Sequence, residues 1–268
     1  MYYSTENMDY WYEIHGEGIP VVLLHGFTGS STTWRSLVQQ EYTGFKFITI
    51  DLPGHGLTKG KAVKTMDACC NNLHQLFQEL GLNKFFLAGY SMGGRTALSY
   101  AVKYPECIQG LLLESASPGL QNESERKKRV ENDQLLAERI EREGIKAFIN
   151  YWENIALFST QKFLTVEKQE AIRKERLSHT ATGLANSLRG MGTGAQTAEW
   201  ESLHMLPFPV LLIAGSLDKK FVKINECMLE LFPNAELKVC ENVGHAVHLE
   251  EPQIFNDLLV TFAKSHAS

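Results

Sequence analysis

The stretch Gly89-Tyr90-Ser91-Met92-Gly93-Gly94-Arg95 lies between an apolar run at residues 85–88 and a helix-compatible run at residues 96–102. This order predicts a strand, a sharp turn and a helix, with Ser91 at the turn. Glycines two residues before and two residues after the serine let the strand and the helix approach closely, and the strained turn exposes the serine hydroxyl. The pattern predicts a nucleophile elbow; the alternative is an ordinary turn serine beside permissive glycines.

Two earlier apolar runs also end in glycine-rich loops. Residues 20–24 precede His25-Gly26-Phe27, and residues 45–50 precede Asp51-Leu52-Pro53-Gly54-His55-Gly56. Continuous apolar runs are typical of strands that are buried on both faces of a sheet. A further strand of this kind is predicted at residues 108–113, after the elbow helix.

Helix-type patterns fall between these strands. We expect helices near residues 33–40 and 65–80, the second with apolar residues at helical spacing before the stop signal Gly81. Alternating strands and helices require crossover connections, so an α/β fold with a mostly parallel sheet flanked by helices is predicted. Residues 9–15 alternate in polarity and are predicted to form an edge strand of that sheet.

The pattern changes after Pro118. From residue 118 to residue 190 no strand-type apolar run occurs, and the charged stretches are helix-compatible. We interpret residues 118–190 as an inserted helical cap between two core segments, residues 1–117 and 191–268. The glycine-rich residues 189–194 are predicted to be a flexible return to the core. Strands at residues 209–214 and 235–240 and helices at residues 222–232 and 252–264 complete the predicted fold.

Composition limits the classes of function. The chain has 268 residues, of which 44% are hydrophobic, enough for one large core. Its net charge of -5 gives no global positive field for nucleic acid or an anionic membrane. The five cysteines have no metal-ligand spacing, so we expect reduced thiols. We also expect no metal or organic cofactor, since no ligand cluster appears in the sequence. The absence of a signal-peptide pattern and of a membrane-length apolar run predicts a cytoplasmic protein, which we expect to be a monomer or homodimer.

Candidate catalytic residues follow the predicted strands, where open α/β sheets place their ligands. Asp218 follows the strand at residues 209–214, and His245 follows the strand at residues 235–240. With Ser91 they appear in the chain order serine, acid, histidine that triads on such sheets have. In this hypothesis His245 takes the serine proton and Asp218 fixes the imidazole tautomer. Glu114 is the rival acid, and a turn carboxylate and a loop histidine are the non-catalytic alternatives.

An oxyanion hole requires two preorganised N–H donors. The residue after the nucleophile, Met92, and Phe27, in the loop after an earlier strand, are the candidates. We expect His25 to fix that loop rather than to titrate. His248, three residues after His245, is expected to be exposed or to pack against neighbours.

The loops and the elbow together resemble the α/β-hydrolase superfamily over nearly the whole chain. More narrowly, the elbow, Pro118-Gly119-Leu120, Trp152 and Leu188-Arg189-Gly190-Met191-Gly192-Thr193-Gly194 resemble the 2-succinyl-6-hydroxy-2,4-cyclohexadiene-1-carboxylate synthases of menaquinone biosynthesis. This resemblance implies a lyase in which the triad abstracts a proton beside a succinyl ketone and pyruvate leaves the cyclohexene ring.

The family substrate carries several carboxylates, which an acidic protein must meet with local cations, and arginine forks suit them. Arg95 lies one turn into the elbow helix, within reach of the pocket. The resemblance implies that Arg129 and Arg176 bind carboxylates and that Tyr90 and Trp152 line the pocket. The alternatives are a helix-surface pair between Glu125 and Arg129 and ordinary packing of the two aromatic rings.

Two other functions use the same residues. A carboxylesterase or related small-acyl hydrolase needs the triad but has no need of several cap arginines. A ligand-binding protein without activity is the third hypothesis, because a fold does not fix a function. The complete serine, acid and histidine set argues against it.

Overall fold

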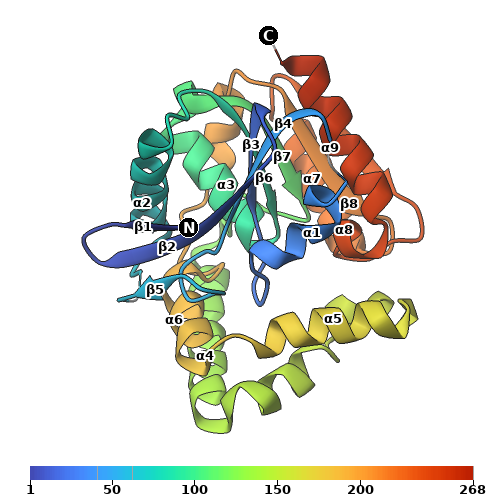
Figure 1. Ribbon diagram of the computed structural model, residues 1–268. Coiled ribbons are helices and arrows are strands. Elements are labelled where there is room, and N and C mark those ends of the chain that lie inside the picture. Colours follow the sequence, from blue (N-terminus) through green and yellow to red (C-terminus); the bar gives the residue numbers. More distant parts are fainter. Residues whose placement is uncertain (41, 62, 268) are drawn as a thin grey trace.

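The structure of the protein is a computed structural model that describes residues 1–40, 42–61 and 63–267; Ser268, the end of the predicted second core segment, lies outside them. Within this part of the chain, nine strands form one sheet (Figure 1). Its path is β1 (Tyr2–Ser4), β2 (Met8–His15), β4 (Gly44–Ile50), β3 (Gly18–Leu24), β6 (Phe85–Tyr90), β7 (Ile108–Glu114), β8 (Val210–Gly215) and β9 (Ala235–Cys240), and β5 (Lys59–Gly60) pairs with β2.

The six strands from β4 to β9 along this path are parallel, whereas β2 is antiparallel to β4. The predicted mostly parallel sheet is confirmed. In β3 the buried Val22 and Leu24 belong to one hydrophobic core, and Val21 and Leu23 belong to the other. The run is continuously apolar because successive side chains alternate between two faces of the sheet and both faces are covered.

Helices cover both faces of the sheet (Figure 1). One core contains residues of α2 (Met66–Glu79), α3 (Met92–Lys103) and α7 (Lys219–Leu229). The other contains residues of α1 (Arg35–Val38), α8 (Val247–Glu250) and α9 (Pro252–His266). The Thr65 side chain accepts a hydrogen bond from the Ala68 amide at the start of α2, so a capping residue marks the predicted helix start.

Between β7 and β8 the chain forms a helical insertion, which lies beyond one end of the sheet (Figure 1). It consists of α4 (Glu123–Trp152), η3 (Ala156–Phe163), α5 (Val166–Leu177) and α6 (Ala181–Met191). α4 contains a kink at Gly144, whose φ is 79°. A separate apolar cluster joins α4 to α6, so the insertion has a small core of its own: Ala137, Ile140, Phe148, Ile149, Leu184, Ala185 and Leu188.

Three predictions about single elements differ from the structure. β2 is an edge strand only in its second half, because β1 pairs with Asp9, Tyr10 and Trp11 on its outer side; alternating polarity reports a half-buried face and not the lack of a neighbour. Residues 189–191 belong to α6 rather than to a flexible return. A Cβ at Gly190 would lie 2.1 Å from the Val63 carbonyl oxygen, so this glycine permits close packing. α7 begins at Lys219 and not at residue 222, because the Asp218 carboxylate accepts from the Phe221 amide and caps it.

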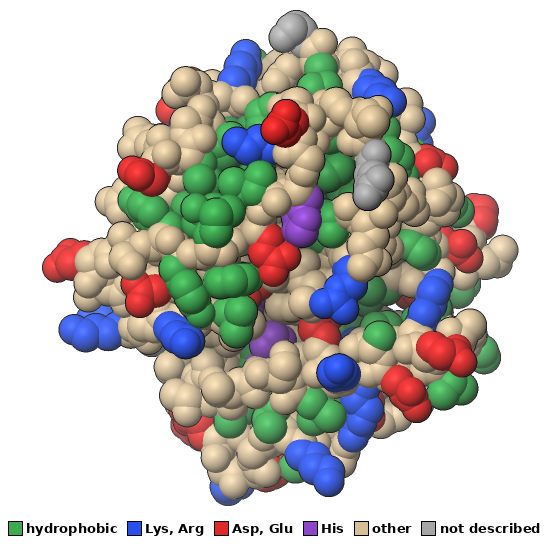
Figure 2. All heavy atoms as spheres, viewed as in Figure 1, with side chains coloured by type: hydrophobic (Ala, Val, Ile, Leu, Met, Phe, Trp, Pro, Cys, Tyr) green, Lys and Arg blue, Asp and Glu red, His purple; other side chains and the backbone are tan. Residues whose placement is uncertain are grey.

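The surface in Figure 2 has Lys and Arg side chains interspersed with Asp and Glu rather than gathered in one patch. In the described part of the chain, no helix has the length and apolar character needed to cross a bilayer. All five cysteines are free thiols in the structure.

Candidate active site

The elbow holds Ser91 between β6 and α3 with φ 51° and ψ −106°. A positive φ is uncommon for a residue with a side chain and requires support from its surroundings. A Cβ at Gly89 would lie 2.4 Å from the Gly93 carbonyl oxygen, and one at Gly93 would lie 2.1 Å from the Leu24 carbonyl oxygen. Glycine at both positions therefore allows strand, turn and helix to meet around the serine.

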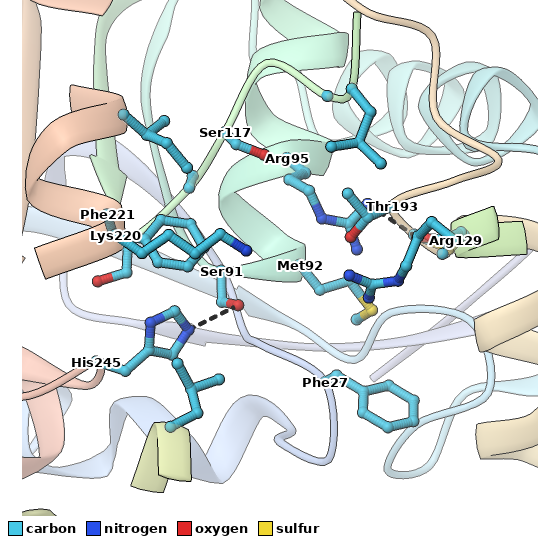
Figure 3. A pocket seen from close by; sticks show the side chains of 18 of the residues that line it. Phe27, Ser91, Met92, Arg95, Ser117, Arg129, Thr193, Lys220, Phe221 and His245 are labelled. Carbon is cyan, nitrogen blue, oxygen red and sulfur yellow. Dashed lines mark hydrogen bonds between the residues drawn. The ribbon is translucent and has the colours of Figure 1, made fainter. Parts of the chain in front are cut away.

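Ser91, His245 and Asp218 form one hydrogen-bonded chain, of which Figure 3 shows the bond between Ser91 and His245. Oγ of Ser91 lies 3.1 Å from Nε2 of His245, and Nδ1 of His245 lies 2.6 Å from Oδ2 of Asp218. The imidazole and the carboxylate have side-chain exposures of 2% and 8%. This geometry allows the serine proton to pass to Nε2 while the carboxylate stabilises the resulting imidazolium.

Glu114, the rival acid, binds a different histidine. Its carboxylate accepts hydrogen bonds from Nδ1 of His248, at 2.8 Å, and from the His248 amide, at 3.1 Å. Both side chains are buried, so the expectation of an exposed His248 is wrong and that of a packed one is right. The Tyr90 ring contacts both imidazoles, with centroids 5.3 Å from His245 and 4.4 Å from His248.

The two residues predicted to supply oxyanion donors lie at the cavity that contains the serine. Phe27 and Met92 line the same cavity as Ser91, and within the described residues neither amide donates to a protein acceptor. His25 donates from Nδ1 to the Gly26 carbonyl, at 2.8 Å, and accepts the Leu52 amide at Nε2, at 2.9 Å. Burial lowers the pKa of His25 to about 3, so a neutral imidazole holds this loop, as predicted.

A cavity of about 470 Å³ opens above Ser91. Ser91 and His245 form one side, and Arg95 and Arg129 lie on the other (Figure 3). Tyr90 and Trp152 line it, as the resemblance implies. Its wall thus combines a proton-transfer chain with two guanidinium groups, which suits a reactive ligand that carries negative charge.

Arg95 is buried beneath this cavity. Its Nη1 donates to the Met191 carbonyl, at 2.9 Å, and to Oε1 of Gln196, at 3.1 Å. Burial, and then the charge of Arg129, lowers the pKa of Arg95 to about 10. The guanidinium is still charged at neutral pH, where a bound carboxylate would relieve both its desolvation and the repulsion from Arg129.

Arg129 does not pair with Glu125, the partner that the helix-surface alternative requires. Its Nε donates to Oδ1 of Asp133 at 2.8 Å, one turn further along α4. The Arg129 side chain is 41% exposed, and it lines the cavity. The pair with Asp133 orients the guanidinium without covering it.

The structure does not bring Arg176 to the Ser91 cavity. The guanidinium is buried against the Phe158 ring, 4.7 Å from its centroid, and donates to Oε1 of Gln161 at 2.8 Å. Phe158 lines the Ser91 cavity, whereas Arg176 lines the neighbouring hollows. Phe27, Tyr90 and Phe158 line both the Ser91 cavity and one of these hollows, so Arg176 is adjacent to the cavity without lining it.

Known proteins share both the fold and the sequence. A model of the alpha/beta hydrolase fold family matches residues 19–252. A Bacillus subtilis (strain 168) protein is 42% identical over 91% of this chain and 90% of its own length. Its name assigns it provisionally as a 2-succinyl-6-hydroxy-2,4-cyclohexadiene-1-carboxylate synthase. The synthase of that name from Salmonella agona (strain SL483) is 32% identical over 87% of this chain and 88% of its own.

The chain belongs to the α/β-hydrolase fold family. Among solved structures, one described as MenH from S. aureus has a TM-score of 0.91 and 33% identity, covering 98% of this chain and all of the other. A malate-bound thermophilic esterase from Thermogutta terrifontis has a TM-score of 0.87 and 28% identity, covering 97% of this chain and 95% of the other. The predicted resemblance to the synthases is confirmed.

Sequence reasoning missed two residues of this α/β-hydrolase fold protein that approach the triad. Lys220 and Phe221 line the cavity from the first turn of α7, and the Phe221 ring lies 4.8 Å from the His245 ring between centroids. Figure 3 shows the Lys220 side chain extending toward Ser91. Asp218 could have indicated both residues, because an aspartate that caps a helix is followed directly by the residues of the first helical turn.

Proposed function

We propose that the chain is a carbon–oxygen lyase of menaquinone biosynthesis. Its substrate is 2-succinyl-5-enolpyruvyl-6-hydroxy-3-cyclohexene-1-carboxylate, and its products are pyruvate and 2-succinyl-6-hydroxy-2,4-cyclohexadiene-1-carboxylate. The names of the synthases that it resembles support this assignment. The observation that carries it is the position of Arg95 and Arg129 in the same cavity as Ser91 and His245.

In the proposed reaction Ser91 acts as a base and forms no acyl intermediate. His245 takes the hydroxyl proton, and the serine oxygen removes the proton from the ring carbon beside the succinyl ketone. The electron pair moves onto the ketone oxygen and gives an enolate. The amides of Phe27 and Met92 are the proposed donors to that oxygen, because a preorganised pair of N–H groups stabilises an enolate as it does a tetrahedral intermediate.

The elimination then completes without net change in the protein. The enolate electron pair returns to the ring, the carbon–oxygen bond to the enolpyruvyl group breaks, and a ring double bond forms. The imidazolium of His245 supplies a proton to the departing enolpyruvate, which becomes pyruvate. Asp218 keeps the imidazole in the tautomer that accepts and returns this proton. These steps require a base and an electrostatic sink, and no metal or organic cofactor enters them.

The remaining predicted residues have binding roles in this proposal. Arg95 and Arg129 hold carboxylates of the substrate through charge-assisted hydrogen bonds, and Tyr90 and Trp152 pack against its apolar ring. Arg176 keeps its proposed role only if the helical insertion rearranges around Phe158. We propose that the insertion, residues 118–190, acts as a cap on the two core segments, and that the protein works in the cytoplasm as a monomer or homodimer.

One assay tests the proposal against its main alternative. Purified protein is mixed with the succinyl-enolpyruvyl-cyclohexene carboxylate and, separately, with nitrophenyl esters of short acids, and pyruvate and nitrophenol are followed. We expect pyruvate release at an ordinary enzymatic rate and ester hydrolysis that is at least about 100-fold slower in kcat/KM. Rapid ester hydrolysis without pyruvate release would reject the lyase.

A carboxylesterase is the second candidate, since the likeness to the Thermogutta terrifontis esterase favours it. The same serine, histidine and aspartate would then form and hydrolyse an acyl-enzyme. A burst of nitrophenol equal to the enzyme concentration would identify this chemistry. The two arginines would then bind an acidic group of the ester.

A further inference from the structure

The helical insertion touches the core at the loop that carries Phe27. Phe148 and Trp152 of α4 pack against the Phe27 ring, and two residues hydrogen-bond the core here: Glu175, at the end of α5, and His179, in the connection from α5 to α6. Neither Glu175 nor His179 lines the Ser91 cavity, so neither has a place in the chemical steps proposed above.

Glu175 binds the turn that follows the loop. Its Oε1 accepts from the Ser30 amide at 2.8 Å, the Ser30 hydroxyl at 2.7 Å and the hydroxyls of Thr32 and Thr33 at 2.8 Å each. Within the described residues no Lys, Arg or His forms an ion pair with Glu175. Four donors from one short segment converge on one oxygen, and hydrogen bonds to a charged acceptor are stronger than those to neutral acceptors.

His179 joins two core loops. Its Nε2 donates to the Thr28 carbonyl at 2.8 Å, and its Nδ1 accepts from the Gly56 amide at 3.1 Å. The ring is buried, and burial lowers its pKa, so the imidazole is neutral with its proton on Nε2. It contacts the His55 ring, 5.3 Å away between centroids, which in turn contacts the Phe27 ring at 5.5 Å.

The loop between these contacts has an uncommon conformation. Thr28 has a φ of 69°, a value that a β-branched residue adopts only when its surroundings impose it. One residue earlier, the peptide unit before Phe27 joins the Gly26 carbonyl to the Phe27 amide. From the core, His25 and the Gly29 amide hold that carbonyl, at 2.8 Å and 3.0 Å. From the insertion, His179 holds Thr28, the residue directly after Phe27.

We propose that Glu175 and His179 are positioning residues that orient the Phe27 N–H. The oxyanion hole is then complete only when the helical insertion is seated on the core, which couples closure over the substrate to stabilisation of the enolate. The inference rests on the proposed function for the identity of that oxyanion. The contacts themselves belong to this chain whatever the ligand.

The test compares Glu175→Ala and His179→Ala with two glutamine variants. Glu175→Gln keeps a hydrogen-bond acceptor, and His179→Gln keeps both a donor and an acceptor. Glu170→Ala is the matched control, because Glu170 is an exposed glutamate on the same helix. We expect the alanine variants to lower kcat for pyruvate release about 10- to 100-fold, part of the loss seen when an oxyanion donor is removed. KM should change less than about threefold, because the arginines still bind the substrate. The glutamine variants should recover most of kcat.

Amide hydrogen exchange gives a readout that does not depend on activity. Exchange in residues 26–34 should become faster in Glu175→Ala and His179→Ala and stay unchanged in Glu170→Ala, with other core peptides unaffected. The inference is overturned if exchange quickens while kcat stays at the wild-type value, if exchange does not change, or if all core peptides exchange faster together.

Failure of the proposed function is a separate outcome. A wild-type protein that releases no pyruvate rejects the lyase, and nitrophenyl ester hydrolysis then becomes the activity measured. Its tetrahedral oxyanion uses the same Phe27 N–H, so the same fall in kcat with little change in KM supports the positioning role. An unchanged kcat for ester hydrolysis in both alanine variants overturns it.

Discussion

Nδ1 of His245 lies 2.6 Å from Oδ2 of Asp218, whereas the carboxylate of Glu114 binds His248. Two buried acid–histidine pairs therefore stand side by side, with the Tyr90 ring in contact with both imidazoles. Only the first pair reaches a serine. This difference separates a catalytic role from a structural one for residues of the same types.

Asp218→Asn should lower kcat for pyruvate release about 10³- to 10⁴-fold, because an amide no longer enforces the imidazole tautomer that accepts the Ser91 proton. Glu114→Gln should change kcat less than about threefold while it lowers the free energy of unfolding by roughly 1–3 kcal/mol, since a buried charged hydrogen bond is weakened. Steady-state kinetics and urea unfolding measure the two effects. The opposite ranking would make Glu114 the catalytic acid.

Ser91→Ala should reduce pyruvate release at least about 10³-fold and leave product binding within a factor of about three, because the hydroxyl acts in the chemical step. Isothermal titration with the cyclohexadiene product measures binding. Ser117→Ala, which alters another serine of the cavity wall, is the control and should retain most of the activity. Undiminished pyruvate release by Ser91→Ala would end the serine-base mechanism.

Arg129→Met should raise KM about 10- to 100-fold, since a hydrogen bond to a charged group contributes about 1.5–3 kcal/mol. Arg139→Met is the matched control: Arg139 also lies on α4 and also pairs with an acid four residues later, but it does not line the cavity. We expect its KM to equal that of the wild type. Equal KM values for both variants would remove Arg129 from substrate binding.

Lys220→Gln should raise KM by about two- to fivefold at low salt, the size expected for a solvent-exposed cation near a bound anion. The effect should fade as ionic strength increases. Lys219→Gln changes the adjacent lysine, which does not line the cavity, and should behave as the wild type at every salt concentration. A salt-independent difference between the two variants would contradict an electrostatic role.

Acid should destabilise the fold through three buried histidines, His25, His55 and His179. Burial lowers the pKa of each below its ordinary value of 6.5, so below pH 6.5 the unfolded chain binds more protons than the folded one. Stability is therefore complete above this pH and is lost as the pH falls. Three protons set an upper limit of about 4 kcal/mol per pH unit on this slope, and His179→Gln should make the slope smaller.

Urea unfolding between pH 7.5 and pH 4.5 measures that slope for both proteins. Ser178→Ala, which changes the exposed residue before His179 and removes no titrating group, is the control. It should leave the slope as it is in the wild type. If His179→Gln also leaves the slope unchanged, its imidazole is not a neutral buried group.

The elements that hold the active site were predictable because they depend on neighbours in sequence. Apolar runs gave β3, β4, β6, β7 and β8, and the glycines beside Ser91 gave the elbow. Crossover connections then make these strands parallel, which places their carboxyl ends at one edge of the sheet. The convergence of Ser91, Asp218 and His245 is a consequence of that topology.

Side-chain partners were not predictable, because they depend on which face of a helix meets which loop. Arg176 and Lys220 are two examples. Arg176 was expected in the cavity but packs against the Phe158 ring and does not line it. Lys220 was passed over and lines the cavity. A shift of one residue in the start of α7, or a rotation of α5 about its axis, would change which of these side chains line the cavity.

The sequence by itself determined the α/β fold, the elbow and the chain order of the triad, since local periodicity and glycine placement encode them. Only the tertiary structure decided that the Glu114 carboxylate binds His248, that Arg129 lines the Ser91 cavity whereas Arg176 does not, and that Glu175 and His179 hold the Phe27 loop. These contacts join segments far apart in the chain, and packing of the helical insertion against the sheet sets them. No local pattern carries that information.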